Sequence, residues 1–210
     1  MDIYPLFASN LIRVTFEDKK ALNILKKIHN KYEYVDTKQE GSNGVFATEN
    51  KFVLENYPEI KQSLVEEFKK INETIFKYDC EFFITTSWIA KVTKNGYSQL
   101  HSHRNSFYSG VLYFGEYTKN NKHAPIQFYS PMDDFRPYYV VTKEWNITNC
   151  STWDIYPNEN MLLFFPSYLK HRIAKHNDEK PRYSLAFNIV PTGSYGTGDS
   201  FYDTRWFVGK

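Results

Sequence analysis

Three histidines, two of them separated by a single residue, form the pattern in this sequence that best suits a metal ion. His101 and His103 flank Ser102 just before the strand-like segment FYSGVLYF. In an extended backbone the side chains of residues i and i+2 point to the same side, so both imidazoles can converge on one ion. His171 follows another strand-like segment much later, in FFPSYLKHRI. A close pair with a distant third is typical of a three-ligand site that leaves positions open for substrate and oxygen.

The segment RYSLAFNIV carries a second pattern, a strand with two unlike faces. One face is polar or small and contains Arg182, Ser184, Ala186 and Asn188, whereas the other is large and apolar and contains Tyr183, Leu185, Phe187 and Ile189. Burying polar side chains in a core costs free energy, so a polar inner face on a core strand is expected only where that face lines a pocket. An Arg and a hydroxyl two residues on can hold a carboxylate, the Arg bidentately. From the residues alone, an ordinary half-exposed strand with a solvated Arg182 is the alternative.

The other histidines are less informative. His29 falls on the polar side of a predicted helix and His123 in a loop rich in Lys and Asn, so we expect both at the surface. His176-Asn177-Asp178 is a literal His-x-Asp, but it lies in the polar segment HNDEKPR and no histidine follows it. We therefore interpret it as a solvated hairpin loop. Without a metal, the three candidate ligands would be surface or hydrogen-bonded histidines.

Composition limits the class of protein. The 210 residues suit one ordinary domain, and 26 Lys+Arg against 24 Asp+Glu give a net charge of +2, which argues against a strongly basic nucleic-acid-binding surface. With 17 Tyr and 17 Phe the chain can bury a core, so disorder is not expected. The longest purely apolar run, residues 161–165, is too short for a membrane span. Two isolated cysteines and an N-terminus unlike a secretory signal predict reduced thiols and a cytoplasmic location.

Residue spacing predicts helices first and strands afterwards. Residues 3–16 are expected to form a strand, and residues 34–56 are expected to be irregular. Asp18 is predicted to cap a helix that runs through about residue 31, and Pro58 to start a second helix that ends near Phe76. Segments rich in β-branched and aromatic residues predict strands at 81–92, 107–114, 126–129, 138–141, 161–165 and 183–190. The fold class is therefore mainly β with flanking helices, an antiparallel sandwich or barrel buttressed by two N-terminal helices.

The same reasoning predicts one domain with three parts. Residues 1–80 supply the first strand and the supporting helices, residues 81–192 the β core, and residues 193–210 a Gly-rich tail. Residues 191–200 are expected to form a mobile loop, after which the segment FYDTRWF would dock on the body or on a neighbouring molecule. The oligomeric state is open.

The combined order of HSHRNSFYSGVLYF, MLLFFPSYLKHRI and PRYSLAFNIVPTG resembles the Fe(II)/2-oxoglutarate-dependent dioxygenases. More narrowly, it resembles an oxygenase family common in marine phages. The resemblance covers about Trp88 to Gly193 and implies a double-stranded β-helix core of the jelly-roll or cupin type. It implies a hydroxylase that uses Fe(II), 2-oxoglutarate and O2, releases succinate and CO2, and works in the host cytoplasm if it is phage-encoded.

The resemblance also implies roles for individual residues. His101 would be the first metal ligand and His171 the distal one. Arg182 would pair with the distal carboxylate of 2-oxoglutarate, helped by Ser184. The full set assigned to 2-oxoglutarate is Arg182, Ser184, Tyr113 and Asn188.

One position departs from the family's usual His-x-Asp/Glu pattern, because His103 stands where a carboxylate is common. Imidazole suits iron, so we predict that His103 is the third ligand. Three neutral imidazoles leave the site one charge more positive than two histidines and a carboxylate. In the alternative, His103 points away, and water or a more distant acid completes the site.

The substrate is not readable from the residues. A prolyl or other amino-acid side chain of a protein or peptide, a free amino acid, another small molecule or a nucleobase would each suit this superfamily. No membrane partner is expected, and the near-neutral charge argues against tight binding to duplex DNA. Residues 116–160, between the two ligand segments, are interpreted as an insertion over the pocket mouth that recognises substrate. Aromatic rings near the motifs are expected to keep the pocket dry: Trp88, Tyr97, Phe107, Tyr108, Phe128 and Tyr129.

Two other functions compete with this interpretation. A cupin-type dioxygenase with three His ligands and no need for 2-oxoglutarate is favoured by His103 but leaves Arg182 and Ser184 unexplained. A non-catalytic jelly-roll binding or structural module would use the aromatic surface and bind no metal.

Overall fold

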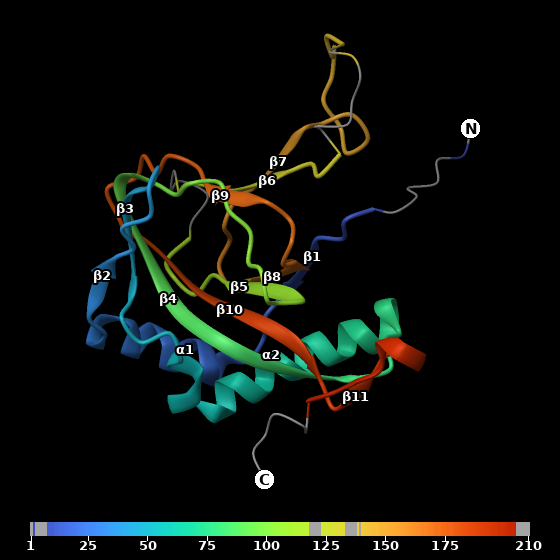
Figure 1. The fold of residues 1–210 in the computed structure, drawn as a ribbon. Helices are drawn as coiled ribbons and strands as arrows, with labels where there is room; N and C mark the ends of the chain where they lie inside the picture. Colours follow the sequence, from blue (N-terminus) through green and yellow to red (C-terminus); the bar gives the residue numbers. More distant parts are fainter. Residues whose placement is uncertain (1, 3–7, 118–122, 133–137, 139, 205–210) are drawn as a thin grey trace.

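The computed structural model describes residues 2, 8–117, 123–132, 138 and 140–204. Helices come early in the chain and pack on one face of a large antiparallel sheet, while a small sheet lies over its other face (Figure 1). The large sheet has the strand order β1-β8-β5-β10-β4-β3-β2, and the small one β7-β6-β9. Two sheets face each other across a pocket, with helices behind the larger one.

The elements have the following bounds. The large sheet contains β1 (Ile12–Thr15), β2 (Tyr34–Asp36), β3 (Asn43–Thr48), β4 (Glu81–Tyr97), β5 (Tyr108–Leu112), β8 (Met161–Pro166) and β10 (Arg182–Thr192). The small sheet contains β6 (Ile126–Tyr129), β7 (Thr152–Ile155) and β9 (His171–Ile173). The helices are α1 (Lys19–Ile28) and α2 (Pro58–Ile71), and a short hairpin of β11 (Ser194–Tyr195) and β12 (Tyr202–Asp203) follows β10.

Both helices begin where the sequence predicts. The carboxylate of Asp18 accepts a hydrogen bond from the Ala21 backbone N–H at 2.9 Å, which caps α1. The Ser63 hydroxyl of α2 donates to the same carboxylate at 2.6 Å, so the cap also joins the two helices. These hydrogen bonds, the one from Ala21 first, lower the pKa of Asp18. Pro58 occupies the first turn of α2, and a single π-helical turn extends that helix to Phe76.

Strand alternation divides the apolar residues between two cores. Leu112, Phe164 and Phe187 point toward the helices and join the larger core. Tyr113 and Phe165 point the other way and join the core between the two sheets. On β10 this alternation turns the small and polar face predicted from the sequence toward the inter-sheet pocket.

Several predicted elements differ from the structure. The first strand covers only Ile12–Thr15 within the described residues, since residues 3–7 lie outside them. The segment 34–56 is not irregular, because β2 and β3 extend the large sheet there. In the segment predicted as a strand at 138–141, the described residues form none, and Val140 and Val141 are exposed. A strand that the sequence did not predict, β7, pairs with β6 on the side away from β9, and its polar sequence gives a weak strand signal.

The tail after β10 is more ordered in secondary structure than predicted. Instead of one loop at 191–200, β10 runs to Thr192 and β11 pairs with β12. The Thr204 hydroxyl accepts from the Gly193 N–H at 2.8 Å, which closes this hairpin. The described part of the aromatic segment therefore docks on its own chain. Within the described residues, neither helix is long and apolar enough to cross a bilayer.

Candidate metal centre and its pocket

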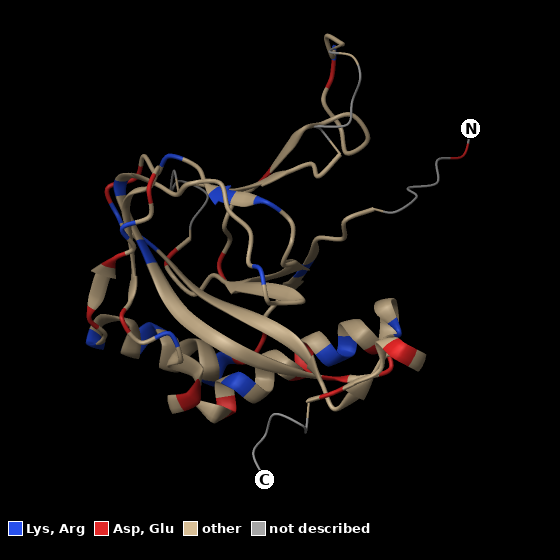
Figure 2. Cartoon of the chain, in the orientation of Figure 1, with Lys and Arg blue, Asp and Glu red and all other residues tan. Residues whose placement is uncertain are grey.

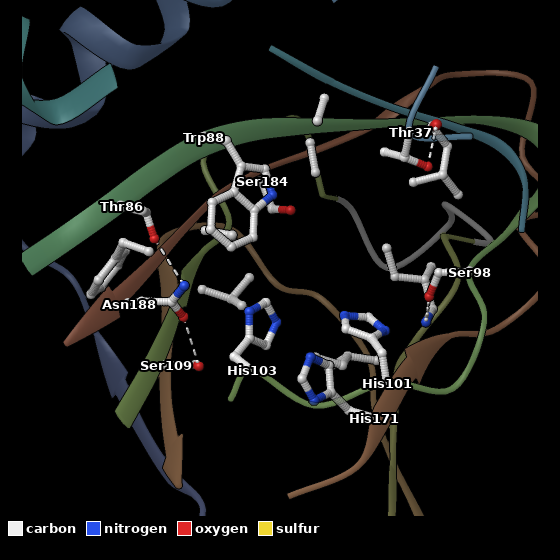
Figure 3. Close-up of a pocket in the computed structure, with 18 of the residues that line it drawn as sticks. Thr37, Thr86, Trp88, Ser98, His101, His103, Ser109, His171, Ser184 and Asn188 are labelled. Carbon is white, nitrogen blue, oxygen red and sulfur yellow. Dashed lines mark hydrogen bonds between the residues drawn. The ribbon is translucent and has the colours of Figure 1, made fainter. Parts of the chain in front are cut away.

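Backbone pairing brings His101, His103 and His171 together. His101 and His171 exchange two backbone hydrogen bonds, of 3.0 and 2.9 Å, and the His103 N–H donates to the Ser167 carbonyl at 2.9 Å. These contacts pin the segment after β4 against the start of β9. One nitrogen from each ring lies within 4.8 Å of the others, and the three rings face a common space (Figure 3).

Carbonyl groups orient two of the rings. The Nδ1 atom of His101 lies 3.0 Å from the Gln99 carbonyl oxygen, and that of His171 lies 2.8 Å from the Leu169 carbonyl oxygen. A carbonyl can only accept, so Nδ1 carries the proton in each ring and Nε2 keeps its lone pair. Metal-binding histidines are commonly held in this way, with one nitrogen donating to a backbone carbonyl and the other free for the ion.

Ring stacking orients the third histidine. The imidazole of His103 lies nearly parallel to that of His171, at 9° and 5.2 Å between centroids, and stacks on Trp88 at 24° and 5.6 Å. His103 therefore points toward the other two rings rather than away from them. The structure thus brings all three imidazoles around one space.

Burial keeps the imidazoles of His103 and His171 neutral, the form that binds metals. Desolvation, followed by the nearby His101 ring, lowers the pKa of His103 to about 4. The same two causes, in the same order, lower the pKa of His171 to about 3. Because a metal ion competes with protons for the ring nitrogens, a depressed pKa favours metal binding at neutral pH.

Arg182 is buried at the start of β10, with only 1% of its surface exposed. Its Nε atom donates to the Ala124 carbonyl at 3.1 Å, and its Nη2 atom donates to the Tyr113 hydroxyl at 2.8 Å. Its Nη1 atom is buried and has no hydrogen-bond partner among the described residues. Because the Tyr113 oxygen accepts from Arg182, its own O–H remains free to donate. A buried guanidinium with an unused donor fits an anionic ligand.

The histidines and Arg182 line one pocket of about 640 Å³ between the sheets. Ser184 lines it two residues beyond Arg182, and Trp88 projects from β4 into the same space (Figure 3). Ser184 is itself 3% exposed, so its hydroxyl is accessible only from the pocket. The pocket thus combines a cluster of three imidazoles with a buried guanidinium.

Asn188 lies at the opposite end of the pocket from Arg182. It is six positions further along β10, about 20 Å in an extended strand. Its amide donates to the Thr86 hydroxyl at 2.9 Å and accepts from the Ser109 hydroxyl at 3.0 Å. A bulge in β4 turns Thr86 toward it, because Phe187 pairs with Ser87 whereas Ile189 pairs with Ile84. The structure therefore does not bring Asn188 next to the Arg182 anchor.

Of the six rings expected to line the pocket, only Trp88 does so. Tyr108 points into the helix-side core, Phe128 into the inter-sheet core, and Tyr129 lies under Arg172. Tyr97 and Phe107 are partly exposed. All six rings lie near the motifs in the sequence, but side chains alternate between the two faces of a strand. A ring therefore faces the pocket only if it lies on the pocket side of its strand. Besides Trp88, Phe165 of the inter-sheet core is an aromatic residue that lines the pocket.

The expectation for His123 and His176 was wrong. Both are buried, at 6% and 0% exposure, because the segment after β9 folds back against residues 123–125. His29 is half-buried between the rings of Phe114 and Tyr183. From the described part of residues 116–160, only Ile126 lines the pocket, and the described residues of the connection between β6 and β7 extend away from the body (Figure 1).

Three nitrogen ligands that leave positions open are typical of metal sites at which further ligands bind. Residues 86–188 match a family model described as "Putative 2OG-Fe(II) oxygenase". Over these residues, the β core of the chain is similar to the 2-oxoglutarate/Fe(II) oxygenases. No curated protein matches the sequence.

Solved structures share the fold at low sequence identity. HygX from Streptomyces hygroscopicus, solved with nickel, 2-oxoglutarate and hygromycin B, has a TM-score of 0.61 and 9% identity over 88% of this chain and 84% of that chain. A prolyl-4-hydroxylase from Pseudomonas putida has a TM-score of 0.60 and 14% identity over 87% and 92%. The viral collagen prolyl hydroxylase of Paramecium Bursaria Chlorella virus-1, in complex with 2-oxoglutarate, has a TM-score of 0.55 and 9% identity over 85% and 94%. These similarities confirm the predicted double-stranded β-helix fold.

Proposed function

We propose that this chain is an Fe(II)- and 2-oxoglutarate-dependent oxygenase that hydroxylates a small-molecule or peptide substrate. The observation that carries the proposal is the shared pocket, in which three imidazole nitrogens lie within 4.8 Å of one another and a buried Arg182 has an unused Nη1 donor. The family match of residues 86–188 supports the same chemistry.

The chain's own residues fit the metal and the cosubstrate. His101 and His171 offer Nε2 lone pairs, and His103 supplies a third nitrogen, a donor set that suits Fe(II). Iron and 2-oxoglutarate, when bound, supply the activation of O2 and the oxidation of a C–H bond, with release of succinate and CO2.

Arg182, Tyr113 and Ser184 would hold the distal carboxylate of 2-oxoglutarate. The guanidinium offers Nη1, and the Tyr113 hydroxyl can donate because it already accepts from Nη2. Burial raises the pKa of Tyr113, and the neighbouring Arg182 opposes that rise. The phenol therefore keeps its proton and acts as a donor to an anion at neutral pH.

The other end of the pocket would receive the substrate. Trp88 supplies an apolar wall beside His103, while Thr86 and Asn188 supply polar groups. Lys51 lines the same pocket and donates to the Thr48 carbonyl at 2.6 Å. A substrate with both an apolar part and hydrogen-bonding groups suits this surface.

The proposal is tested by metal analysis of anaerobically purified protein and by succinate formation from 2-oxoglutarate with Fe(II) and ascorbate. We expect one iron per chain, its loss in His101→Ala and His171→Ala, and loss of 2-oxoglutarate binding in Arg182→Met. Arg172→Met is a matched control, because Arg172 is an exposed arginine next to His171 and is bound to Gln127. Iron retained in both alanine variants would overturn the ligand assignment.

A three-His dioxygenase that needs no 2-oxoglutarate is the second candidate, and His103 is the residue that favours it. It predicts iron bound to the protein but no succinate formed, and no effect of Arg182→Met on metal-dependent turnover. Protein without any bound metal would instead favour a non-catalytic jelly-roll module.

A further inference from the structure

His176 is a fully buried histidine outside the metal centre, with 0% of its surface exposed. Its backbone is tied to the end of β4, since its N–H donates to the Gly96 carbonyl at 2.8 Å and its carbonyl accepts from Asn95 at 2.7 Å. Its ring lies parallel to that of His123, at 8° and 5.2 Å between centroids. These contacts fix the position of the imidazole.

The hydrogen bonds of the His176 ring define a single neutral tautomer. The backbone N–H of Ala124 donates to Nδ1 at 3.2 Å, so Nδ1 must be unprotonated. The Nε2 atom lies 2.9 Å from the Lys180 carbonyl oxygen and must carry the proton. Both ring nitrogens are therefore used, one as an acceptor and one as a donor.

Ala124 connects this ring to the proposed carboxylate anchor. Its N–H is bound to His176, while its carbonyl accepts from Arg182 Nε at 3.1 Å. Ala124 is 2% exposed, so water cannot easily replace either partner. The adjacent Pro125 carbonyl accepts from the Ala174 N–H at 3.1 Å, which provides the segment with a second attachment.

We propose that His176 is a positioning residue for 2-oxoglutarate: by holding Ala124, it fixes the carbonyl that orients the Arg182 guanidinium toward the distal carboxylate. The inference rests on the proposed function, because it assumes that Arg182 binds that carboxylate. Two contacts, from Ala124 and Tyr113, set the plane of the guanidinium and leave Nη1 directed at the ligand. If the Ala124 carbonyl moves, the Arg182 guanidinium loses one of the two contacts that orient it. The hydrogen bond between Pro125 and Ala174 limits how far this segment can move.

Two substitutions of His176 separate this role from simple filling of space. In His176→Asn the side-chain oxygen can occupy the place of Nδ1 and accept from Ala124. In His176→Gln the longer amide reaches the place of Nε2 near Lys180 and leaves the Ala124 N–H without its acceptor. The readout is the affinity for 2-oxoglutarate in the presence of redox-inactive Ni²⁺, measured by calorimetry. A second probe, 2-oxopentanoate, has the same keto-acid end but no distal carboxylate.

We expect His176→Gln to weaken 2-oxoglutarate binding by about 10-fold and to leave 2-oxopentanoate binding unchanged, since the loss of one buried hydrogen bond changes an equilibrium by about this order. His176→Asn should retain most of the wild-type affinity. In an Arg182→Met background, His176→Gln should have no further effect on 2-oxoglutarate, because the contact it supports is gone. Three results would each overturn the proposal. The first is an equal loss of 2-oxoglutarate affinity in His176→Asn and His176→Gln, and the second is an equal loss of affinity for 2-oxoglutarate and 2-oxopentanoate in His176→Gln. The third is an undiminished effect of His176→Gln in the Arg182→Met background.

The same measurements distinguish the proposal from the function on which it rests. If Arg182→Met binds 2-oxoglutarate as tightly as the wild type, the carboxylate anchor itself is wrong. If Arg182→Met loses binding but His176→Gln does not, only the role of His176 fails. If His176→Gln does not fold, Ala124→Pro breaks the same hydrogen bond by removing the donor N–H instead of the acceptor. It should likewise weaken the binding of 2-oxoglutarate and leave the binding of 2-oxopentanoate unchanged.

Discussion

His103 is the residue that separates this site from the usual His-x-Asp/Glu pattern. It stacks between Trp88 and His171 and directs a nitrogen toward the other two histidines. A carboxylate at this place would cancel one positive charge of a divalent ion, which a neutral imidazole does not do. Among the described residues that line the pocket there is no Asp or Glu to take over this task. The local charge therefore depends on the anionic ligands that enter.

Substitution of His103 tests whether it binds the metal. We expect His103→Leu to weaken Ni²⁺ binding by at least about 100-fold, because one of three protein ligands is lost. His103→Asp should retain binding, since a carboxylate is also a good ligand for such ions. Competition with a chelator of known affinity measures both variants. Wild-type affinity in His103→Leu would show that water or another group completes the site.

The buried His171 makes the metal-free protein sensitive to acid. Its pKa in the folded protein is lowered to about 3, whereas an unfolded chain takes up this proton near pH 6.5. As the pH falls below 6.5 the unfolded state binds more protons, so the free energy of unfolding falls, by at most about 1.4 kcal/mol per pH unit for one histidine. Urea unfolding of metal-free protein between pH 7 and pH 4.5 measures this slope. His171→Phe should show a shallower slope, and an unchanged slope would refute the assignment.

At the scale of the elements, Gly110 lets β5 and β10 pack side by side. A Cβ atom at Gly110 would lie 2.2 Å from the tip of the Phe187 ring, which is fully buried on the adjacent strand. The glycine is therefore needed for steric space, since the ring takes the volume that any side chain would fill.

Gly110→Ala is expected to destabilise the protein by about 1–3 kcal/mol through overpacking. In a Phe187→Leu background the same substitution should cost less, because the ring tip that it meets is absent. Chemical unfolding of the two single variants and the double variant measures the coupling. Additive losses would indicate that Phe187 is not the group displaced.

Sequence patterns predicted those elements that have a strong local signal. Asp18 and Pro58 mark the helix starts correctly, and the alternating faces of β10 identify Arg182 and Ser184 as pocket residues. The weaker strands β2, β7 and β9 are short, and their positions depend on partners far away in the chain. The burial of His176 was missed for the same reason, because its polar neighbours suggest a solvated turn, and distant contacts with residues 95–96 and 123–124 bury it.

At the scale of the whole molecule, most charged residues lie away from the part of the sheet that faces the pocket. Lys, Arg, Asp and Glu lie mainly on the helices, the loops and the strand ends, while the middle of β4 and β10 carries no charge in the ribbon (Figure 2). The pocket therefore lies over an uncharged stretch of sheet, with Arg182 at one end. Because a low local dielectric strengthens the interaction of a buried guanidinium with an anion, this layout favours carboxylate binding at that end.

The central place of β10 in the large sheet has a consequence for synthesis of the chain. β10 lies between β4 and β5 and follows in sequence every other strand of that sheet. On the ribosome, a nascent chain that stops before Arg182 would contain all three histidines, yet β4 and β5 would have no strand between them. Their open edges would be prone to pair with other chains until β10 emerges. The pocket can therefore close only after β10 has been translated, when all the other strands of both sheets and the three histidines have already been made.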